Sequence, residues 1–157
     1  MKDEPLVLPF DGRQSETAAM IARGVRRLLR ARGFSSVTEL LLVDGRRADI
    51  VAVNGDGEVL IVEVKSSPAD FRADRKWRDY AACCDRLYFA ISDRTPAAIM
   101  PAGAGLILAD PYGAEILREA DFQRMASARR RAVLLRFAQA AADRLHRLAD
   151  PSGALES

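Results

Sequence analysis

The sequence predicts a single α/β domain in which a mixed β-sheet is flanked by helices. The chain of 157 residues has the length of one domain with one core, and 49% of its residues are hydrophobic. Helical periodicity near both ends brackets a series of short apolar strands. Because no internal repeat divides the chain, we expect a lead-in over 1–13, one domain over 14–149 and a tail over 150–157.

The first half of the chain is predicted to form a helix and three strands. Ser15 is suited to cap the helix, apolar residues recur at helical spacing after it, and Gly33 is suited to end it. Strands are expected over 37–43 and 48–53. The turn NGDGE then leads into a third strand, VLIVEVK, so these two strands form a hairpin.

The second half is predicted to alternate helices and strands. A helix is expected from about 70 to 84, followed by a strand over 86–92 and a loop over 95–105 that is rich in Pro, Ala and Gly. The short strands GLILAD and AEILRE come next, and an amphipathic helix is expected over about 122–149. The order of elements gives a mixed sheet with helices on its faces.

Charge and composition exclude several classes of protein. The net charge of +2 gives a weak overall field, although arginines concentrate in 23–32 and 129–136. Such runs are typical of solvated helix faces, and the alternative is phosphate binding. No apolar run is long enough to span a bilayer, and the acidic N-terminus lacks the features of a signal peptide, so a cytoplasmic location without membrane contact is expected.

Several common sites are also not supported. Cys83 and Cys84 are adjacent, which suits neither a zinc knuckle nor an easy disulfide. His146 is the only histidine, so the sequence does not indicate a histidine metal site or a Ser-His-Asp triad. No GxxxxGK[ST] loop is present for nucleotide binding.

A charged pair in the third strand indicates the candidate site. Glu63 and Lys65 share one face of a strand that is otherwise apolar, and Asp49 on the partner strand falls roughly level with Glu63. The hairpin loop leaves this register open by about one or two residues. Buried carboxylates repel one another unless a cation lies between them, and Mg²⁺ favours one or two carboxylates with further oxygen ligands, such as the Val64 carbonyl.

Lys65 is suited to position an attacking water and to offset charge on a phosphate, although Glu–Lys pairs at this spacing are also common on exposed sheets without any function. Glu16 is a candidate third carboxylate, and its alternative is a favourable acid at a helix N-terminus. Candidate DNA contacts are basic or aromatic residues on the later helices, namely Lys76, Tyr80, Arg129 and Arg130.

These residues resemble a known motif and a known family. Asp49, thirteen residues and then Glu63-Val64-Lys65 resemble the PD-(D/E)xK nuclease motif, with Ala48 at the proline position. The order helix, three strands, helix, strand is similar to the restriction-endonuclease-like core. The longer block IVEVKSSPADFRADRKWRDYAACCDRLYFAI resembles the MmcB family of bacterial DNA repair proteins, and the likeness spans about 14–148.

The resemblance implies an endonuclease that depends on Mg²⁺ or Mn²⁺ and acts in the DNA-damage response. It makes Asp49 and Glu63 the metal carboxylates, Lys65 the catalytic lysine and Glu16 the helix-borne acid. The expected partners are DNA and other repair proteins, and a homodimer is an open alternative. A second interpretation is a catalytically inactive DNA- or protein-binding module of the same fold in a repair complex.

Overall fold

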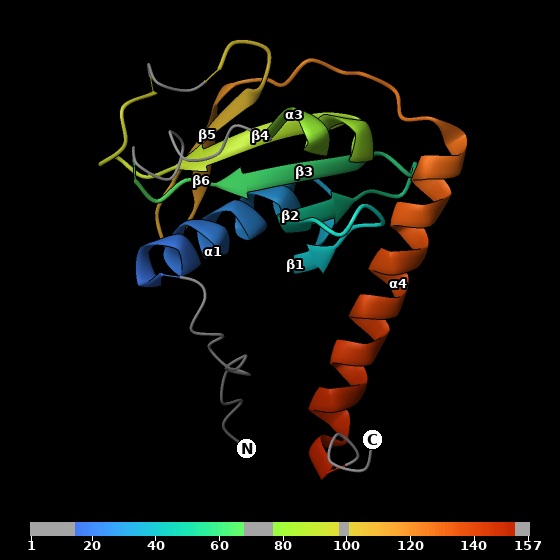
Figure 1. Ribbon diagram of the computed structural model, residues 1–157. Helices are drawn as coiled ribbons and strands as arrows, with labels where there is room; N and C mark the ends of the chain where they lie inside the picture. The colour runs from blue at the N-terminus through green and yellow to red at the C-terminus, as the bar shows by residue number, and fades with distance from the viewer. Residues whose placement is uncertain (1–14, 68–76, 98–100, 153–157) are drawn as a thin grey trace.

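The computed structural model describes residues 15–67, 77–97 and 101–152, and its centre is a six-stranded mixed sheet in the order β1-β2-β3-β4-β5-β6 (Figure 1). β1 to β3 form an antiparallel meander, β3 to β5 are parallel, and β6 returns antiparallel to β5. The sheet confirms the predicted fold class. Its strands are β1 (Ser35–Leu41), β2 (Arg47–Val53), β3 (Val59–Val64), β4 (Arg86–Ile91), β5 (Gly105–Ala109) and β6 (Ala114–Arg118).

Helices cover both faces of the sheet. α1 (Glu16–Ala31) lies on one face, whereas the short α3 (Trp77–Tyr80) and the 3₁₀ turn η1 (Ala81–Cys83) lie on the other (Figure 1). α4 (Ser127–Ala149) packs against the second face and continues along the edge strand β1. Within the described ranges, no helix has both the length and the apolar composition needed to cross a membrane.

The hydrophobic core has two main parts because side chains alternate along each strand. Ile50 and Val62 belong to the part beneath α1. Val51 and Ile61 belong to the part beneath η1 and α4, together with Val133. β3 contributes to both parts, and all six of its residues are buried. A charged side chain on this strand therefore needs a specific partner.

α1 begins and ends where the sequence predicts. The Ser15 side chain accepts a hydrogen bond of 3.1 Å from the Ala18 N–H, and Gly33 follows the helix with a φ of 85°. In the middle of the helix, Gly24 allows a close approach, because a Cβ at this position would collide with the carbonyl oxygen of Asp110. The glycine thus lets α1 pack directly on the turn between β5 and β6.

α4 begins later than the sequence predicts. Helical periodicity suggested a start at 122, but the helix begins at Ser127. The N–H of Gln123 donates to the main-chain oxygen of Asp85, and the N–H of Met125 donates to its carboxylate. These N–H groups are bound by Asp85 instead of by a helical turn, which keeps the segment extended.

Candidate active site

β2 and β3 separate at the end that carries the candidate acids. The last regular pair of the ladder joins Ile50 and Val62. Beyond it, the Asp49 N–H donates to the Glu63 carboxylate at 3.1 Å, and the Val64 N–H donates to the Asp49 carboxylate at 2.8 Å. Side chains therefore replace main-chain partners at this end of the ladder. The sequence left the register of the two strands open, and the observed register places Asp49 opposite Glu63.

The site lies in a buried strand with an apolar neighbour. Glu63 is 3% exposed and Lys65 is 6% exposed, whereas Asp49 is partly buried. On the other side of β3, Phe89 of β4 pairs with Glu63, and the Lys65 N–H donates to the Ala90 carbonyl at 2.9 Å. The Lys65 ammonium lies 6.0 Å from the centre of the Phe89 ring. Phe89 thus forms an apolar wall beside the charged pair.

The electrostatics of the site favour an added positive charge. Burial, and then the negative charge of Asp49, raise the pKa of Glu63 well above its usual range. The nearby ammonium of Lys65 acts in the opposite direction but does not cancel these effects. A cation between the two carboxylates would remove their repulsion, which is the condition that the sequence predicted.

α3 and the β1–β2 turn form the border of the site. The Tyr80 hydroxyl donates to the Arg47 carbonyl at 3.3 Å, close to Asp49 in the same strand. Arg46 forms an ion pair with Asp79, which fastens α3 to the turn. The sequence predicts Tyr80 as a candidate DNA contact, which stays a prediction, and it gives no sign of Arg46, because nothing in the local pattern indicates that this turn meets α3.

The donor set fits a divalent cation with few protein ligands. Among the residues that the structure describes, no three His, Cys, Asp or Glu side chains form a metal-binding group, so Glu16 does not complete a trio with Asp49 and Glu63. Glu16 is exposed in the first turn of α1, a helix that packs on the opposite face of the sheet. Mg²⁺ needs only one or two carboxylates when water and phosphate complete its shell. Asp49 and Glu63 could supply two such carboxylates.

The remaining candidate DNA contacts have separate surroundings. Lys76 lies outside the described residues. The Arg130 guanidinium donates to both carboxylate oxygens of Asp85, at 2.7 and 2.6 Å, and is therefore a structural anchor of α4. Arg129 donates to the Cys83 sulfur at 3.6 Å. The sequence did not indicate that these two arginines point back to the sheet.

The fold and the site define an α/β protein with an acid pair and a lysine at a fork in a mixed sheet. The chain belongs to the MmcB-like DNA repair protein family, whose sequence profile matches residues 4–152. No curated protein shows significant sequence similarity to the chain.

Two solved structures are similar to the chain to very different degrees. A protein of unknown function from Silicibacter pomeroyi is 45% identical, with a TM-score of 0.85 over 88% of this chain and 95% of that chain. A repair endonuclease from Pyrococcus abyssi is 16% identical, with a TM-score of 0.36 over 60% of this chain and 43% of that chain. Only the first similarity is high enough to indicate a shared fold.

Proposed function

We propose that the protein acts in DNA repair as a Mg²⁺- or Mn²⁺-dependent endonuclease of the PD-(D/E)xK type. The observation that carries the proposal is the fork between β2 and β3, where Asp49 faces Glu63 and Lys65 follows on the same strand. Membership in a DNA repair family supports DNA as the substrate. The reaction is the hydrolysis of a phosphodiester bond.

Each residue of the fork has a chemical role in this proposal. Asp49 and Glu63, with the Val64 carbonyl, would hold the ion, which would supply a Lewis acid at the scissile phosphate. The Lys65 ammonium donates hydrogen bonds to the attacking water and to the phosphate oxygens as negative charge develops on them. Burial of Lys65 beside Phe89 limits competing water, which strengthens these contacts.

One observation favours a second candidate, a non-catalytic DNA- or protein-binding module. Each carboxylate of the pair accepts a main-chain N–H from the opposite strand. The acids would then fasten β2 to β3 and have no role in chemistry. This module would bind DNA without divalent ions and would release no product from any substrate.

A divalent-ion titration distinguishes the two candidates. The full chain is incubated with branched, nicked and single-stranded DNA in EDTA, Mg²⁺ or Mn²⁺, and products are resolved on denaturing gels. We expect cleavage with the ions and none in EDTA. Asp49→Asn should abolish cleavage, whereas the matched change Asp56→Asn, at an exposed acid in the β2–β3 turn, should not.

Lys65→Met separates catalysis from folding. The methionine keeps the apolar stem beside Phe89 and removes the ammonium, so we expect cleavage to fall at least about 100-fold. Circular dichroism and urea unfolding should stay close to those of the unmodified chain. Cleavage at an undiminished rate would show that Lys65 has no part in the mechanism.

A further inference from the structure

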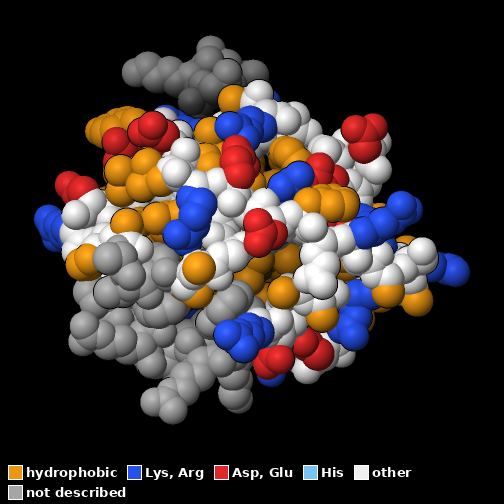
Figure 2. Space-filling model, turned by 90° about the horizontal axis from the view of Figure 1, so that it is seen from above, with side chains coloured by type: hydrophobic (Ala, Val, Ile, Leu, Met, Phe, Trp, Pro, Cys, Tyr) orange, Lys and Arg blue, Asp and Glu red, His pale blue; other side chains and the backbone are white. Residues whose placement is uncertain are grey.

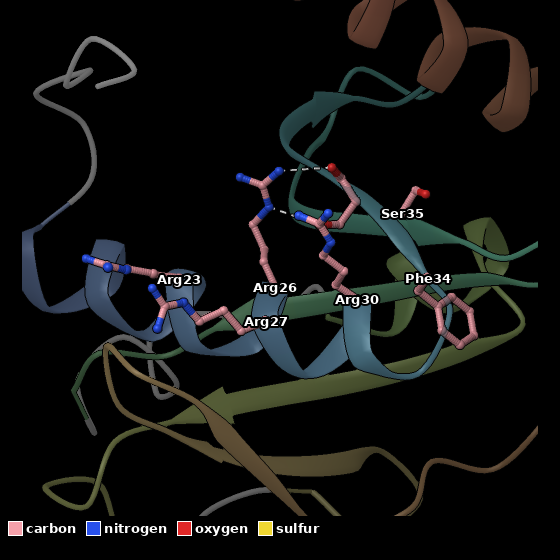
Figure 3. A pocket seen from close by; sticks show the side chains of 7 residues that line it. Arg23, Arg26, Arg27, Arg30, Phe34 and Ser35 are labelled. Carbon is pink, nitrogen blue, oxygen red and sulfur yellow. Dashed lines mark hydrogen bonds between the residues drawn. The ribbon is translucent and has the colours of Figure 1, made fainter. Parts of the chain in front are cut away.

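A groove lined by arginines lies between α1 and the start of β1. It has a volume of about 540 Å³, and its lining comprises Arg23, Arg26, Arg27, Arg30, Phe34, Ser35 and Ser36. Figure 3 shows Arg26 and Arg30 extending from α1 towards the beginning of β1. By contrast, basic and acidic side chains are interspersed on the face seen from above (Figure 2).

The positive charge of the groove is not neutralised by acids of the described residues. None of the four arginines in the lining forms an ion pair with a described carboxylate. Arg26 donates to the hydroxyl and carbonyl of Ser36, at 2.9 and 3.1 Å. Burial, and then the positive charge of Arg144 on α4, hold the pKa of Arg26 below its usual range. A bound anion would relieve this repulsion.

The spacing of the arginines suits a chain of phosphates. Positions 23, 26, 27 and 30 recur at the helical interval that places side chains on one face, and they span about 10 Å along the axis. Arginine forks bind phosphate oxygens in pairs, which lysine does not. A helix face with this spacing can therefore contact successive phosphates of one strand.

The size of the groove and the aromatic ring in its wall favour an unpaired strand. Its volume lies within the range of small-ligand pockets, so it can seat a short stretch of one strand. Phe34 is half-buried against the core beneath α1 and lies in the wall of the groove. A positively charged groove with an aromatic side chain is a feature of single-strand binding, because bases stack on aromatic rings. An acidic peptide would match the charge but would make no use of the ring.

The groove and the acid pair use different faces of the sheet. α1 packs on the face that carries Ile50 and Val62, whereas Asp49 and Glu63 alternate onto the other face. We propose that the groove is a second DNA contact, which binds the sugar–phosphate backbone of an unpaired strand without any need for a divalent ion. The proposal rests on the proposed function only in that both take DNA as the ligand.

The test is a binding measurement in EDTA, where cleavage cannot contribute. A labelled single-stranded oligodeoxynucleotide of mixed sequence is titrated with the unmodified chain and with Arg23→Gln/Arg30→Gln, two exposed positions at which glutamine preserves the helix. We expect the Kd of the double variant to rise at least about 10-fold. The slope of log K against log salt should become shallower by about 1.4, which is about 0.7 for each lost phosphate contact.

Controls make the result specific to the groove. Arg124→Gln/Arg131→Gln removes the same charge at exposed positions outside the lining and should change the Kd less than about 2-fold. Because every titration is made in EDTA, the result does not depend on whether the chain cleaves DNA. Equal losses in both arginine variants, equal losses on blunt duplex, or stronger competition by poly-glutamate than by unlabelled oligonucleotide would each overturn the proposal.

Discussion

At the scale of single residues, Glu63 determines whether the fork is a structural link or an ion site. Its burial and the facing Asp49 favour the protonated form in the folded protein, because both raise the pKa above its ordinary value near 4.5. Between the ordinary and the folded pKa, the folded state binds more protons than the unfolded state. The free energy of unfolding therefore falls as pH rises through this window. At pH values above the window, the folded protein carries the full cost of ionising Glu63.

Glu63→Gln should therefore stabilise the protein at neutral pH in the absence of metal. Glutamine keeps the acceptor for the Asp49 N–H but carries no charge, so the gain should be present at pH 7.5 and should disappear below about pH 4. Thermal unfolding measures it, because each kcal/mol raises Tm by about 2–4 °C in a domain of this size.

The same measurement with Mg²⁺ tests the ion site. The ion should raise the Tm of the unmodified chain and have little effect on the glutamine variant, since only the former offers two carboxylates. Glu115→Gln, at an exposed position on β6, controls for the loss of a charge. If Glu63→Gln raised the Tm by the same amount at pH 4 and at pH 7.5, the raised pKa of Glu63 would not be the cause.

At the scale of elements, Asp85 joins α4 to the sheet. Its carboxylate accepts hydrogen bonds from Arg130 and from the N–H groups of Val59 and Met125, and its side chain is 1% exposed. Burial alone would raise the pKa of Asp85, but these hydrogen bonds outweigh burial and hold the pKa below its usual range. The ionised acid therefore stabilises the folded state.

Arg130→Gln should lower the free energy of unfolding by about 3–5 kcal/mol, because it leaves a buried carboxylate without its charge partner. Urea unfolding measures the loss, and Arg131→Gln, at the exposed neighbouring position, is the matched control. The stabilisation by the pair is present above the ordinary pKa near 3.8 and is lost as pH falls through the lower folded pKa. If Arg130→Gln lowered the free energy of unfolding by the same amount in strong acid, the ion pair with Asp85 would not be the source of the stabilisation.

The same contacts show what the sequence can and cannot predict about elements. Alternation along the strands and the NGDGE turn were enough to place Asp49 near Glu63, because a short hairpin allows few registers. α4 begins later than the sequence predicts, because Asp85, which is distant in sequence, accepts hydrogen bonds from the N–H groups of 123 and 125. Phe122, which lies within the predicted helix but before the observed one, is 55% exposed, and the centre of its ring lies 5.1 Å from the Arg86 guanidinium.

The site also contains features that depend on long-range pairing. Phe89 lies beside Glu63 only because β3 and β4 are parallel neighbours, and no local pattern indicates which strands pair. The sequence shows the arginines of α1 as a cluster and allows two interpretations, a solvated helix face and phosphate binding. The groove that they form with Phe34 and Ser36 depends on how α1 meets β1, which periodicity alone does not determine.

At the scale of the whole molecule, the sheet separates two kinds of site. The acid pair lies on the face covered by η1 and α4, and the arginine groove lies where α1 meets the edge strand β1. One continuous duplex segment would engage one of these faces. A forked DNA, with a paired stem and an unpaired arm, offers a segment to each, so we expect such substrates to be cut more efficiently than blunt duplex.

This arrangement predicts how the groove affects turnover. In Arg23→Gln/Arg30→Gln, the KM for forked DNA should rise about 10-fold while kcat stays unchanged, because the groove contributes binding that is equal in the ground state and the transition state. The same variant should cut blunt duplex as the unmodified chain does, so its preference for the fork disappears. Steady-state cleavage of both substrates measures the effect, with Arg124→Gln/Arg131→Gln as the matched pair. A fall in kcat, or the same loss on both DNAs, would mean that the arginines act at the acid pair and not at a separate contact.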